Sequence, residues 1–386
     1  MHTDFEILDF PTNYEYAMDI HCQLFDPDRD SFFISWNWID SWLQIFNKVV
    51  VNNNEETNQI KFLIIKVDNK PVATFFFGIT KSKGHDFFRC KKAYLGATGI
   101  QEIDNIYIEK NNIVSSSGSW YVDINEILSS LSVDRLSFPG VEHDSWEEIS
   151  KQFKIDKRNS LINSVLTYIV NLDTVRNCSS GYLGTLSSNK RHQINRTIKY
   201  YGSVQDLTIE SPVGLESALK IFDELVDLHN YQWVKKIKNS SFSNKVVYDF
   251  HHNLISKSWG DAAIGIYKIS NKKSVIGYIY GFFSNDTFFF YQSAFSYSDD
   301  NKVKNGLLCH ALLIDYLAEL GLGRYDFLAG DAQYKKSLSN NSYTMNWVDI
   351  YRYRWQCGLV NIVRQCRKKI IHLVNTLRNL YLIRSI

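Results

Sequence analysis

The sequence predicts a mixed α/β (α+β) fold made of two tandem units, each with a mixed central sheet flanked by helices. A chain of 386 residues suggests two or three domains. Strand-like and helix-like periodicities alternate along most of its length. The strand–turn–strand segment at residues 61–73 resembles the one at 263–277, and helices precede both. These observations together indicate a duplicated unit.

The composition is that of a globular protein with an uneven charge distribution. Hydrophobic residues make up 45% of the chain and there are only 5 prolines, which excludes disordered and collagen-like architectures. Residues 1–150 hold 12 basic and 23 acidic side chains, whereas residues 151–386 hold 31 basic and 18 acidic ones. We therefore expect the second half to bind an anion, with chance drift in surface charge as the alternative.

Targeting and metal-binding patterns are not found. The acidic start Met1–Glu6 is not typical of a signal peptide, and no uncharged apolar run reaches the ~20 residues of a membrane helix. The six cysteines are scattered without CxxC spacing, which argues against a zinc ribbon. We expect no metal and a cytoplasmic protein with reduced thiols.

In the first half, an extended segment at residues 31–35 leads into a helix. One face of this helix carries Trp38, Trp42, Ile45 and Phe46. Strands are expected at residues 60–67, 71–80 and 131–138. Pro139-Gly140 is expected to end the last of these strands.

The second half repeats the alternation of strands and helices. Strands are expected at residues 164–172, 262–269, 274–283, 287–297, 325–329 and 345–354. Helices are expected at residues 182–201, 212–233, 244–259 and 306–320. The polar turn 284–287 joins two aromatic strands as a hairpin.

A polar loop leads from the strand that ends near Tyr297 directly into the helix that begins at Gly306. The N–H groups and the positive dipole end of a helix N-terminus favour a phosphate or another anion, and Lys302 and Lys304 add charge. We expect an anion site at this loop. An ordinary capped helix start is the alternative.

A second group of polar residues follows the predicted strand 325–329. Asp331, Tyr334 and Lys335 come directly after its glycine turn, where open α/β sheets bind ligands. Asp331 could accept a proton from an attacking amine or hydroxyl, and Tyr334 could return one to a leaving thiolate. Lys335 could hold a phosphate or carboxylate. The alternative for Asp331 is a helix N-cap.

These segments resemble the GNAT-fold acyltransferases, and more closely the BioF2-like/CelD-type branch found among bacterial polysaccharide-biosynthesis genes. The branch pattern Phe-Asp-Phe-Leu-x-Gly-(Asp/Glu)-x-x-Tyr-Lys is similar to Tyr325-Asp326-Phe327-Leu328-Ala329-Gly330-Asp331-Ala332-Gln333-Tyr334-Lys335. Weaker matches lie at residues 35–38, 186–196, 228–233 and 305–308. The resemblance implies a GNAT-like unit at 1–150 and a GNAT-like acyltransferase unit at 151–350. Residues 351–386 are expected to form a separate basic amphipathic helix.

The resemblance also implies acyl-CoA-dependent N- or O-acyl transfer to an amino sugar or another bacterial surface-glycan precursor, by direct attack in a ternary complex. The donor-binding residues would be Lys302, Lys304, Asn305, Gly306 and Leu307. This loop departs from the (Arg/Gln)-x-x-Gly-x-(Gly/Ala) pattern of ordinary GNAT enzymes. Two alternatives therefore stay open: a Fem-like transferase that uses aminoacyl-tRNA, and a non-catalytic glycan-binding or scaffold protein.

Further candidates lie on two predicted helices. His229 and Trp233 are one turn apart, so they could stack on a sugar ring with His229 as a base; a histidine covering a core tryptophan is the alternative. Lys190, Arg191 and Arg196 could bind the phosphates of a substrate, or they form a solvated basic face.

The C-terminal segment 351–386 is basic and has helically spaced apolar residues, with no acidic residue after Asp349. Such a helix can lie on an anionic membrane surface. We therefore expect peripheral contact with the inner face of the membrane through residues 355–386, with a docking helix as the alternative.

Overall fold

The computed structural model describes residues 2–53, 59–81, 90–104, 106, 108–116, 118–235 and 240–383. Within these ranges the description leaves out the side chains of residues 50–53, 101, 102, 233–235, 367, 368 and 371–383. Residues 1–150 are called the first half below, and residues 151–386 the second half.

The elements of the first half are β1 (Thr3–Asp9), α1 (Tyr14–Leu24), η1 (Phe32–Ile34), α2 (Trp36–Asn53), β2 (Gln59–Val67), β3 (Lys70–Lys81), β4 (Lys91–Leu95), α3 (Gln101–Asp104), β5 (Val114–Ser115), α4 (Ile124–Ser130), β6 (Arg135–Glu142) and α5 (His143–Gln152).

Those of the second half are η2 (Lys157–Asn159), β7 (Ser160–Asn171), α6 (Leu172–Arg176), α7 (Gly181–Thr185), α8 (Ser188–Tyr201), η3 (Val204–Asp206), β8 (Leu207–Glu210), α9 (Leu215–Lys235), η4 (Ser241–Ser243), α10 (Lys245–Ser258), η5 (Trp259–Asp261), β9 (Ile264–Asn271), β10 (Val275–Ser284), β11 (Thr287–Phe295), α11 (Asn305–Glu319), β12 (Arg324–Ala329), α12 (Gln333–Leu338), β13 (Asn341–Tyr351) and α13 (Arg354–Ile383).

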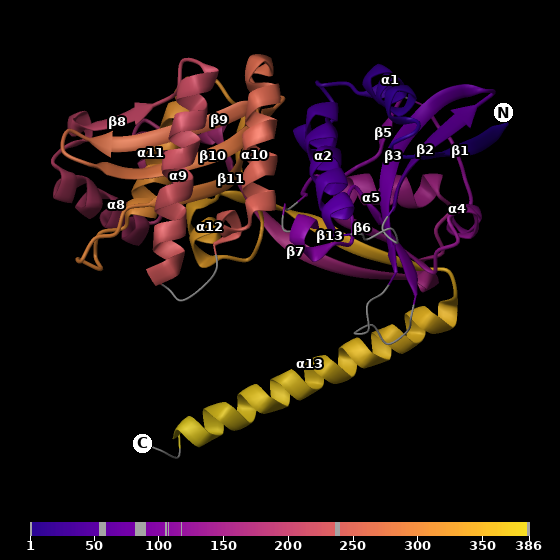
Figure 1. Ribbon diagram of the computed structural model, residues 1–386. Helices are drawn as coiled ribbons and strands as arrows, with labels where there is room; N and C mark the ends of the chain where they lie inside the picture. The colour runs from indigo at the N-terminus through magenta and orange to yellow at the C-terminus, as the bar shows by residue number, and fades with distance from the viewer. Residues whose placement is uncertain are drawn as a thin grey trace.

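The described strands form one continuous mixed sheet in the order β1-β2-β3-β4-β6-β13-β7-β12-β11-β10-β9-β8, with β5 added beside β3. Each half contains the same motif, an antiparallel meander whose last strand pairs in parallel with the next: β4 with β6, and β11 with β12. Long strands β7 and β13 cross between the halves and join them (Figure 1). The expected duplication is therefore confirmed, although the two sheets are joined into one.

The expected end of a strand at Pro139-Gly140 is wrong, because β6 continues through both residues to Glu142. Opposite them, β13 advances by two residues while β6 advances by three, so the ladder contains a bulge. Proline, which has no N–H to donate, is tolerated at a bulge. Gly140 has a φ of 67°, a conformation that glycine adopts without strain.

The expected helix at 182–201 is also corrected, since it is two helices, α7 and α8. Ser187 between them is extended, with ψ of 150°, and its hydroxyl accepts a hydrogen bond from Lys190 N. This N-cap starts a new helix on a different axis. The helices expected at 212–233, 244–259 and 306–320 are confirmed within a few residues, as α9, α10 and α11.

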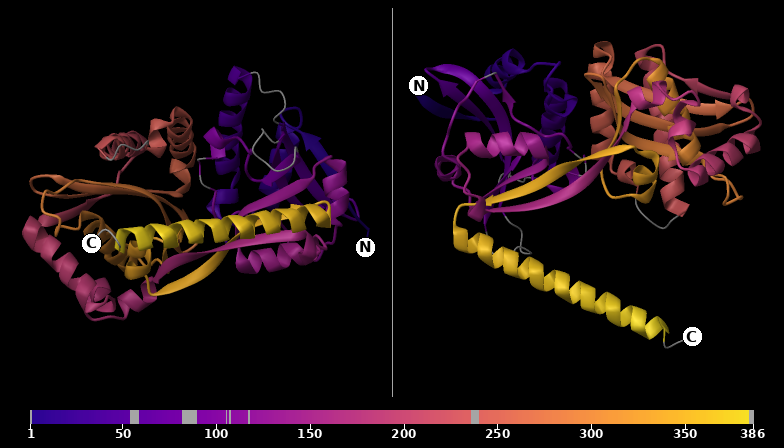
Figure 2. Two further views of the ribbon diagram at one scale, coloured as in Figure 1. Left: turned by 90° about the horizontal axis from the view of Figure 1, so that it is seen from below. Right: turned by 180° about the vertical axis from the view of Figure 1, so that it is seen from behind.

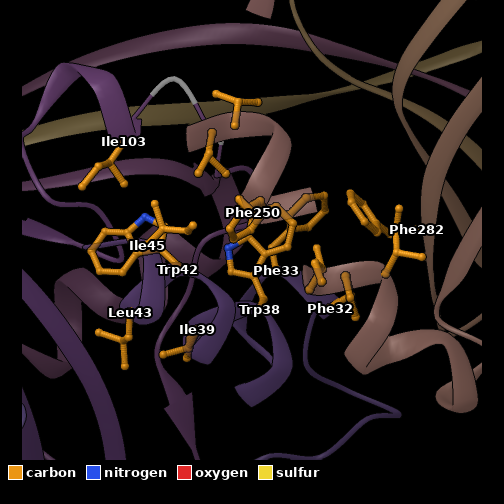
Figure 3. Close-up of a cluster of buried hydrophobic side chains, with 14 of the residues drawn as sticks. Phe32, Phe33, Trp38, Ile39, Trp42, Leu43, Ile45, Ile103, Phe250 and Phe282 are labelled. Carbon is orange, nitrogen blue, oxygen red and sulfur yellow. The ribbon is translucent and has the colours of Figure 1, made fainter. Parts of the chain in front are cut away.

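A hydrophobic core on one face of the sheet is shared by both halves. The buried indole of Trp38 in α2 packs edge-on against Phe33 at 4.9 Å, Phe250 at 5.0 Å and Phe282 at 5.5 Å between ring centroids. Phe250 and Phe282 belong to the second half, and Figure 3 shows these rings gathered in one cluster. The burial of the face predicted for α2 is confirmed: Trp38 and Trp42 are at most 1% exposed.

Helix α13 leaves the end of β13 and extends as a long rod along the lower side of the protein (Figures 1 and 2). Gln356 and Cys357 near its start are buried, whereas Ile362 and Ile370 are 58% and 60% exposed. Among the described residues, no helix has both the length and the apolar character needed to cross a membrane.

Candidate active site

The candidate site lies where β11 and β12 diverge. Their parallel pairing covers only Thr287–Phe289 with Arg324–Asp326, and beyond it β12 pairs with β7 alone. The register of β11 also shifts at Tyr291, opposite the step from Tyr280 to Gly281. The carboxyl ends of parallel strands share one edge of a sheet, so the helix start after β11 and the loop after β12 lie at the same edge.

The predicted donor loop is the N-terminus of α11. Lys304 occupies the N-cap position, makes no side-chain cap and donates its own N–H to Thr197 Oγ1 at 3.0 Å. Asn305 is buried and fixes the loop by donating from Nδ2 to Ser296 O at 2.7 Å. Without a side-chain cap, the first-turn N–H groups remain available to an anion.

Gly306 has a packing role as well as a backbone role. A Cβ at this position would lie 3.1 Å from the ring of Phe295, closer than ordinary van der Waals contact. Leu307 packs against the core of the second half, so its backbone is the part that a donor could meet. Lys302 and Lys304 have exposed side chains at the entrance of this loop.

The three predicted basic residues lie on α8, and one of them reaches the donor loop. Arg196 donates from Nη2 to Lys302 O at 2.9 Å, which holds the loop against α8. Arg191 donates to Leu186 O at 3.1 Å, and Lys190 lies on the same helix, nearer its start than Arg196. The structure therefore brings Arg196 together with the predicted donor-binding residues, on the same side as α11.

The end of β12 brings Asp331, Tyr334 and Lys335 together. Asp331 is exposed, and its Oδ1 accepts a hydrogen bond from Tyr168 at 3.0 Å. The ring of Tyr334 stacks on His310 at 5.8 Å, and burial raises the pKa of Tyr334 to about 12. Its hydroxyl therefore stays protonated at neutral pH.

Lys335 folds back over the strand end, where Nζ donates to Ala329 O at 2.8 Å and Leu328 O at 3.1 Å. Gly330, at the turn that Lys335 covers, has a φ of 127°, a conformation that glycine adopts without strain. Burial lowers the pKa of Lys335, and the nearby carboxylate of Glu109 opposes that shift. Lys335 is therefore held by the backbone rather than directed freely into solvent.

Glu109, which sequence analysis missed, comes from the first half and reaches this strand end. One of its carboxylate oxygens accepts a hydrogen bond from Ala329 N at 2.5 Å. Burial raises the pKa of Glu109 to about 7, although the Ala329 N–H and the charge of Lys335 oppose the shift. A carboxyl group with a pKa near neutral is suited to accept and return protons.

Asp326 is a further buried carboxylate near Glu109 and Lys335. Its Oδ1 accepts from Leu328 N at 2.7 Å and its Oδ2 accepts from Tyr343 at 2.8 Å. Leu328 has a φ of 56°, a strained conformation for a side-chain-bearing residue, at the point where the β7–β12 register shifts. Burial raises the pKa of Asp326.

A cavity of about 320 Å³ lies beside Asp326, between the two halves. Amide side chains, hydroxyls and three basic residues line it, among them Arg29, Lys110, Asn111, Asn285, Arg324 and Tyr343. Lys110 pairs with Glu142 at 2.7 Å and lies over the ring of Tyr343 at 4.2 Å. Both halves therefore contribute to the wall.

His229 and Trp233 lie on α9. His229 is buried, its Nδ1 lies 2.7 Å from Ser240 Oγ, and its ring packs edge-on against Phe242 at 5.3 Å. The side chain of Trp233 lies outside the described residues. The geometry around His229 fits a core histidine as well as a site residue, so its role stays a prediction.

No group of three or more potential metal ligands occurs among the residues that the structure describes.

The profile described as the acetyltransferase (GNAT) domain matches residues 188–336. Among solved structures, FemX superposes with a TM-score of 0.50 at 11% identity, over 88% of this chain and 96% of that chain. The C-terminal domain of a proposed lysylphosphatidylglycerol synthetase from Agrobacterium fabrum superposes with a TM-score of 0.50 at 10% identity, over 90% and 95%. A search of curated proteins found no match. The chain thus has a GNAT-like α/β fold, with similarity to the GNAT acetyltransferase domain in its second half.

Proposed function

We propose that the protein is an acyltransferase of the BioF2-like/CelD-type branch, which transfers an acyl group from acyl-CoA to an amine or hydroxyl of an amino sugar or another surface-glycan precursor. The observation that supports this most is that β11 and β12 diverge. The N-terminus of α11, which has no side-chain cap, follows β11, and a cluster of residues that can exchange protons follows β12. GNAT-type donors need both features, because the helix start binds phosphate and the strand end receives the acyl group.

In the proposed reaction, the acceptor nitrogen or oxygen attacks the thioester carbonyl and the carbon–sulfur bond breaks. A backbone N–H of β11 beyond Phe289, where β12 no longer pairs with it, stabilises the negative oxygen. The acceptor's proton passes to Asp331, as predicted, or to Glu109, whose pKa of about 7 suits a base at neutral pH. Tyr334, protonated at that pH, gives a proton to the leaving thiolate. Positioning supplies most of the rate.

The inter-half cavity is our proposal for the acceptor side. Amide and hydroxyl groups such as those of Asn285, Asn341 and Ser342 suit sugar hydroxyls, which both donate and accept hydrogen bonds. Arg196 is hydrogen-bonded to Lys302 O of the donor loop. We therefore assign it, with Lys190 and Arg191 on the same helix, to donor phosphates or to phosphates near the donor loop.

The Fem-like alternative remains because residues 302–307 depart from the usual GNAT loop. In that alternative the basic second half binds aminoacyl-tRNA, and the affinity falls steeply with salt. Peripheral membrane contact through 355–386 would place either enzyme near a lipid-linked acceptor.

The donor is tested by thermal unfolding of the full chain with and without acetyl-CoA and longer acyl-CoAs. A ligand at a hundredfold excess over its dissociation constant stabilises the native state by about 2.7 kcal/mol. We expect a clear rise in Tm that the double variant Lys302→Glu/Lys304→Glu loses. The matched control, Lys154→Glu/Lys157→Glu, changes the charge equally elsewhere and should keep the rise. If no acyl-CoA raises the Tm of the wild-type protein, the acyl-CoA proposal is contradicted. Salt-dependent binding of tRNA would then support the Fem-like alternative.

Catalysis is tested by thiol release from acetyl-CoA in the presence of glucosamine as the acceptor. Asp331→Asn and Glu109→Gln each remove a proton acceptor while keeping side-chain size. We expect turnover to fall by about 10²–10⁴-fold in the variant that lacks the true base. Wild-type turnover in both variants would reject both assignments. A protein that binds glycan but releases no thiol would support the scaffold alternative.

A further inference from the structure

A second cavity lies outside the proposed active site. Helix α13 passes over the strand face of β6, β13 and β7, and a cavity of about 580 Å³ lies between them. Its lining combines charged and apolar side chains, with Arg135, Asp349 and Arg364 beside Tyr94, Ile162 and Trp347. The volume is that of a site for a small organic molecule. The predicted donor loop, by contrast, belongs to α11 in the second half.

The described side chains around this cavity carry more positive than negative charge. Arg135 and Arg364 both approach one carboxylate, that of Asp349. Asp349 Oδ1 already accepts from Ser137 at 2.6 Å, and Oδ2 accepts from Arg364 Nη2 at 2.8 Å. Arg135 Nε is 3.7 Å from Oδ1, too far for a hydrogen bond. One carboxylate is therefore shared by two guanidinium groups.

Two buried cationic side chains, Arg135 and Lys92, lie close to this shared carboxylate. Nε of Arg135 is buried and has no hydrogen-bond partner among the described residues, which is unfavourable for a charged donor. Lys92, only 4% exposed, pairs in register with Arg135 across β4 and β6. Burial, and then the charge of Arg135, lowers the pKa of Lys92 to about 8. An anion in the cavity would relieve this repulsion.

We propose that the cavity between α13 and the β6–β13–β7 face binds a phosphate-bearing ligand, with Arg135 and Arg364 as its cationic contacts. Guanidinium groups bind phosphate oxygens through paired hydrogen bonds, and Tyr94 lines the same space. Ile162, 48% exposed, and Trp347 offer apolar contact to the rest of the molecule. The ligand is therefore amphiphilic or of sugar-phosphate size.

Helix α13 supplies one side of this site. Arg364 lies on α13, three residues after Asn361, which also lines the cavity. Ile362 and Val363, on the same turn, are exposed at 58% and 39%. A phosphate held by Arg364 could thus belong either to a soluble phosphate ester or to the headgroup of an anionic lipid on which α13 rests. Both sources present the same chemistry to Arg135 and Arg364.

The test measures binding to the full chain in two arms. Calorimetry with glycerol 3-phosphate reports the soluble source, and sedimentation with vesicles of phosphatidylglycerol in phosphatidylcholine reports the lipid source. We expect binding in at least one arm, weakened at least tenfold by Arg364→Ala. The matched control is Arg354→Ala, which removes the same charge from the exposed first turn of α13 and should change the affinity less than twofold.

Absence of binding in both arms overturns the proposal, as does binding that Arg364→Ala leaves unchanged. Arg135→Lys keeps the charge but loses the fork geometry, so it should weaken phosphate binding while the protein stays folded by circular dichroism. The stabilisation by acyl-CoA should be the same in Arg364→Ala and wild type. A failure of this proposal is thereby distinguished from a failure of the proposed acyl-CoA donor site.

Discussion

Replacing Glu109 by glutamine tests the polar contact that joins the two halves at the candidate site. The carboxylate of Glu109 lies against the carboxyl end of β12, and burial raises its pKa from 4.5 to about 7. A shift of roughly 2.5 pH units corresponds to about 3 kcal/mol between the two protonation states. Glutamine has the same shape, carries no charge, and its Oε1 can still accept the hydrogen bond from Ala329 N.

The sign of the effect follows from the raised pKa. Folded wild-type protein binds a proton at Glu109 more tightly than the unfolded chain does. Its contribution to stability is therefore fully present below about pH 4.5 and is lost as the pH rises through about 7. The variant has no such dependence. The free energy of unfolding of Glu109→Gln, relative to wild type, should rise by about 3 kcal/mol between pH 4.5 and 8.

Urea unfolding of both proteins at several pH values in this range measures the difference, because titrations elsewhere in the chain cancel. The control is Glu126→Gln, which neutralises an exposed carboxylate on α4 and should show a flat difference. A flat difference for Glu109→Gln as well would refute the reasoning. It would mean that Glu109 is solvated and does not bury its carboxylate against β12.

The remaining predictions concern the shared core, one glycine and α13. Trp38→Ala should destabilise the protein by about 3–5 kcal/mol in urea unfolding, because the indole is buried between both halves, and a loss below 1 kcal/mol would contradict this. Gly78→Ala should lose more than about 2 kcal/mol in the same assay, since its Cβ would lie 2.1 Å from Ala97 O. A Cβ at Gly214 would have no described atom within 4 Å, so Gly214→Ala should leave the free energy of unfolding nearly unchanged. Truncation after Tyr353 should abolish sedimentation with anionic vesicles, and unchanged sedimentation would reject the proposed membrane contact.

The central strands could be predicted from sequence because their side chains are apolar on both faces. Residues 60–67 and 71–80 form long apolar runs, and the structure buries most of both β2 and β3. Edge strand β1 was not predicted, since most of its residues are only partly buried and it includes three acids. The pairing of β13 with β6 joins residues about 200 positions apart, such as Asp349 and Ser137, and no local pattern encodes it.

In the candidate site, too, some residues could be predicted from the sequence and others could not. Asp331, Tyr334 and Lys335 are neighbours in sequence, so a motif could identify them together. Glu109 contacts Ala329 across 220 residues, and its surroundings in sequence show only a charged pair within a loop. The cavity between the halves depends on the same long-range packing. The motif in the second half could therefore be found in the sequence, but the residues that the first half adds to the candidate site could not be predicted.

That contribution gives the first half a structural role at the candidate site. β13 pairs with β6 and β7 at once, and the core around Trp38 contains rings from both halves. A fragment that begins at residue 151 would leave β13 without its β6 partner and expose Phe250 and Phe282 to water. It would also lack the carboxylate that accepts the hydrogen bond of Ala329 N. The first half is thus part of the geometry at the end of β12, so substitutions around Glu109 should affect the site even though the family similarity begins at residue 188.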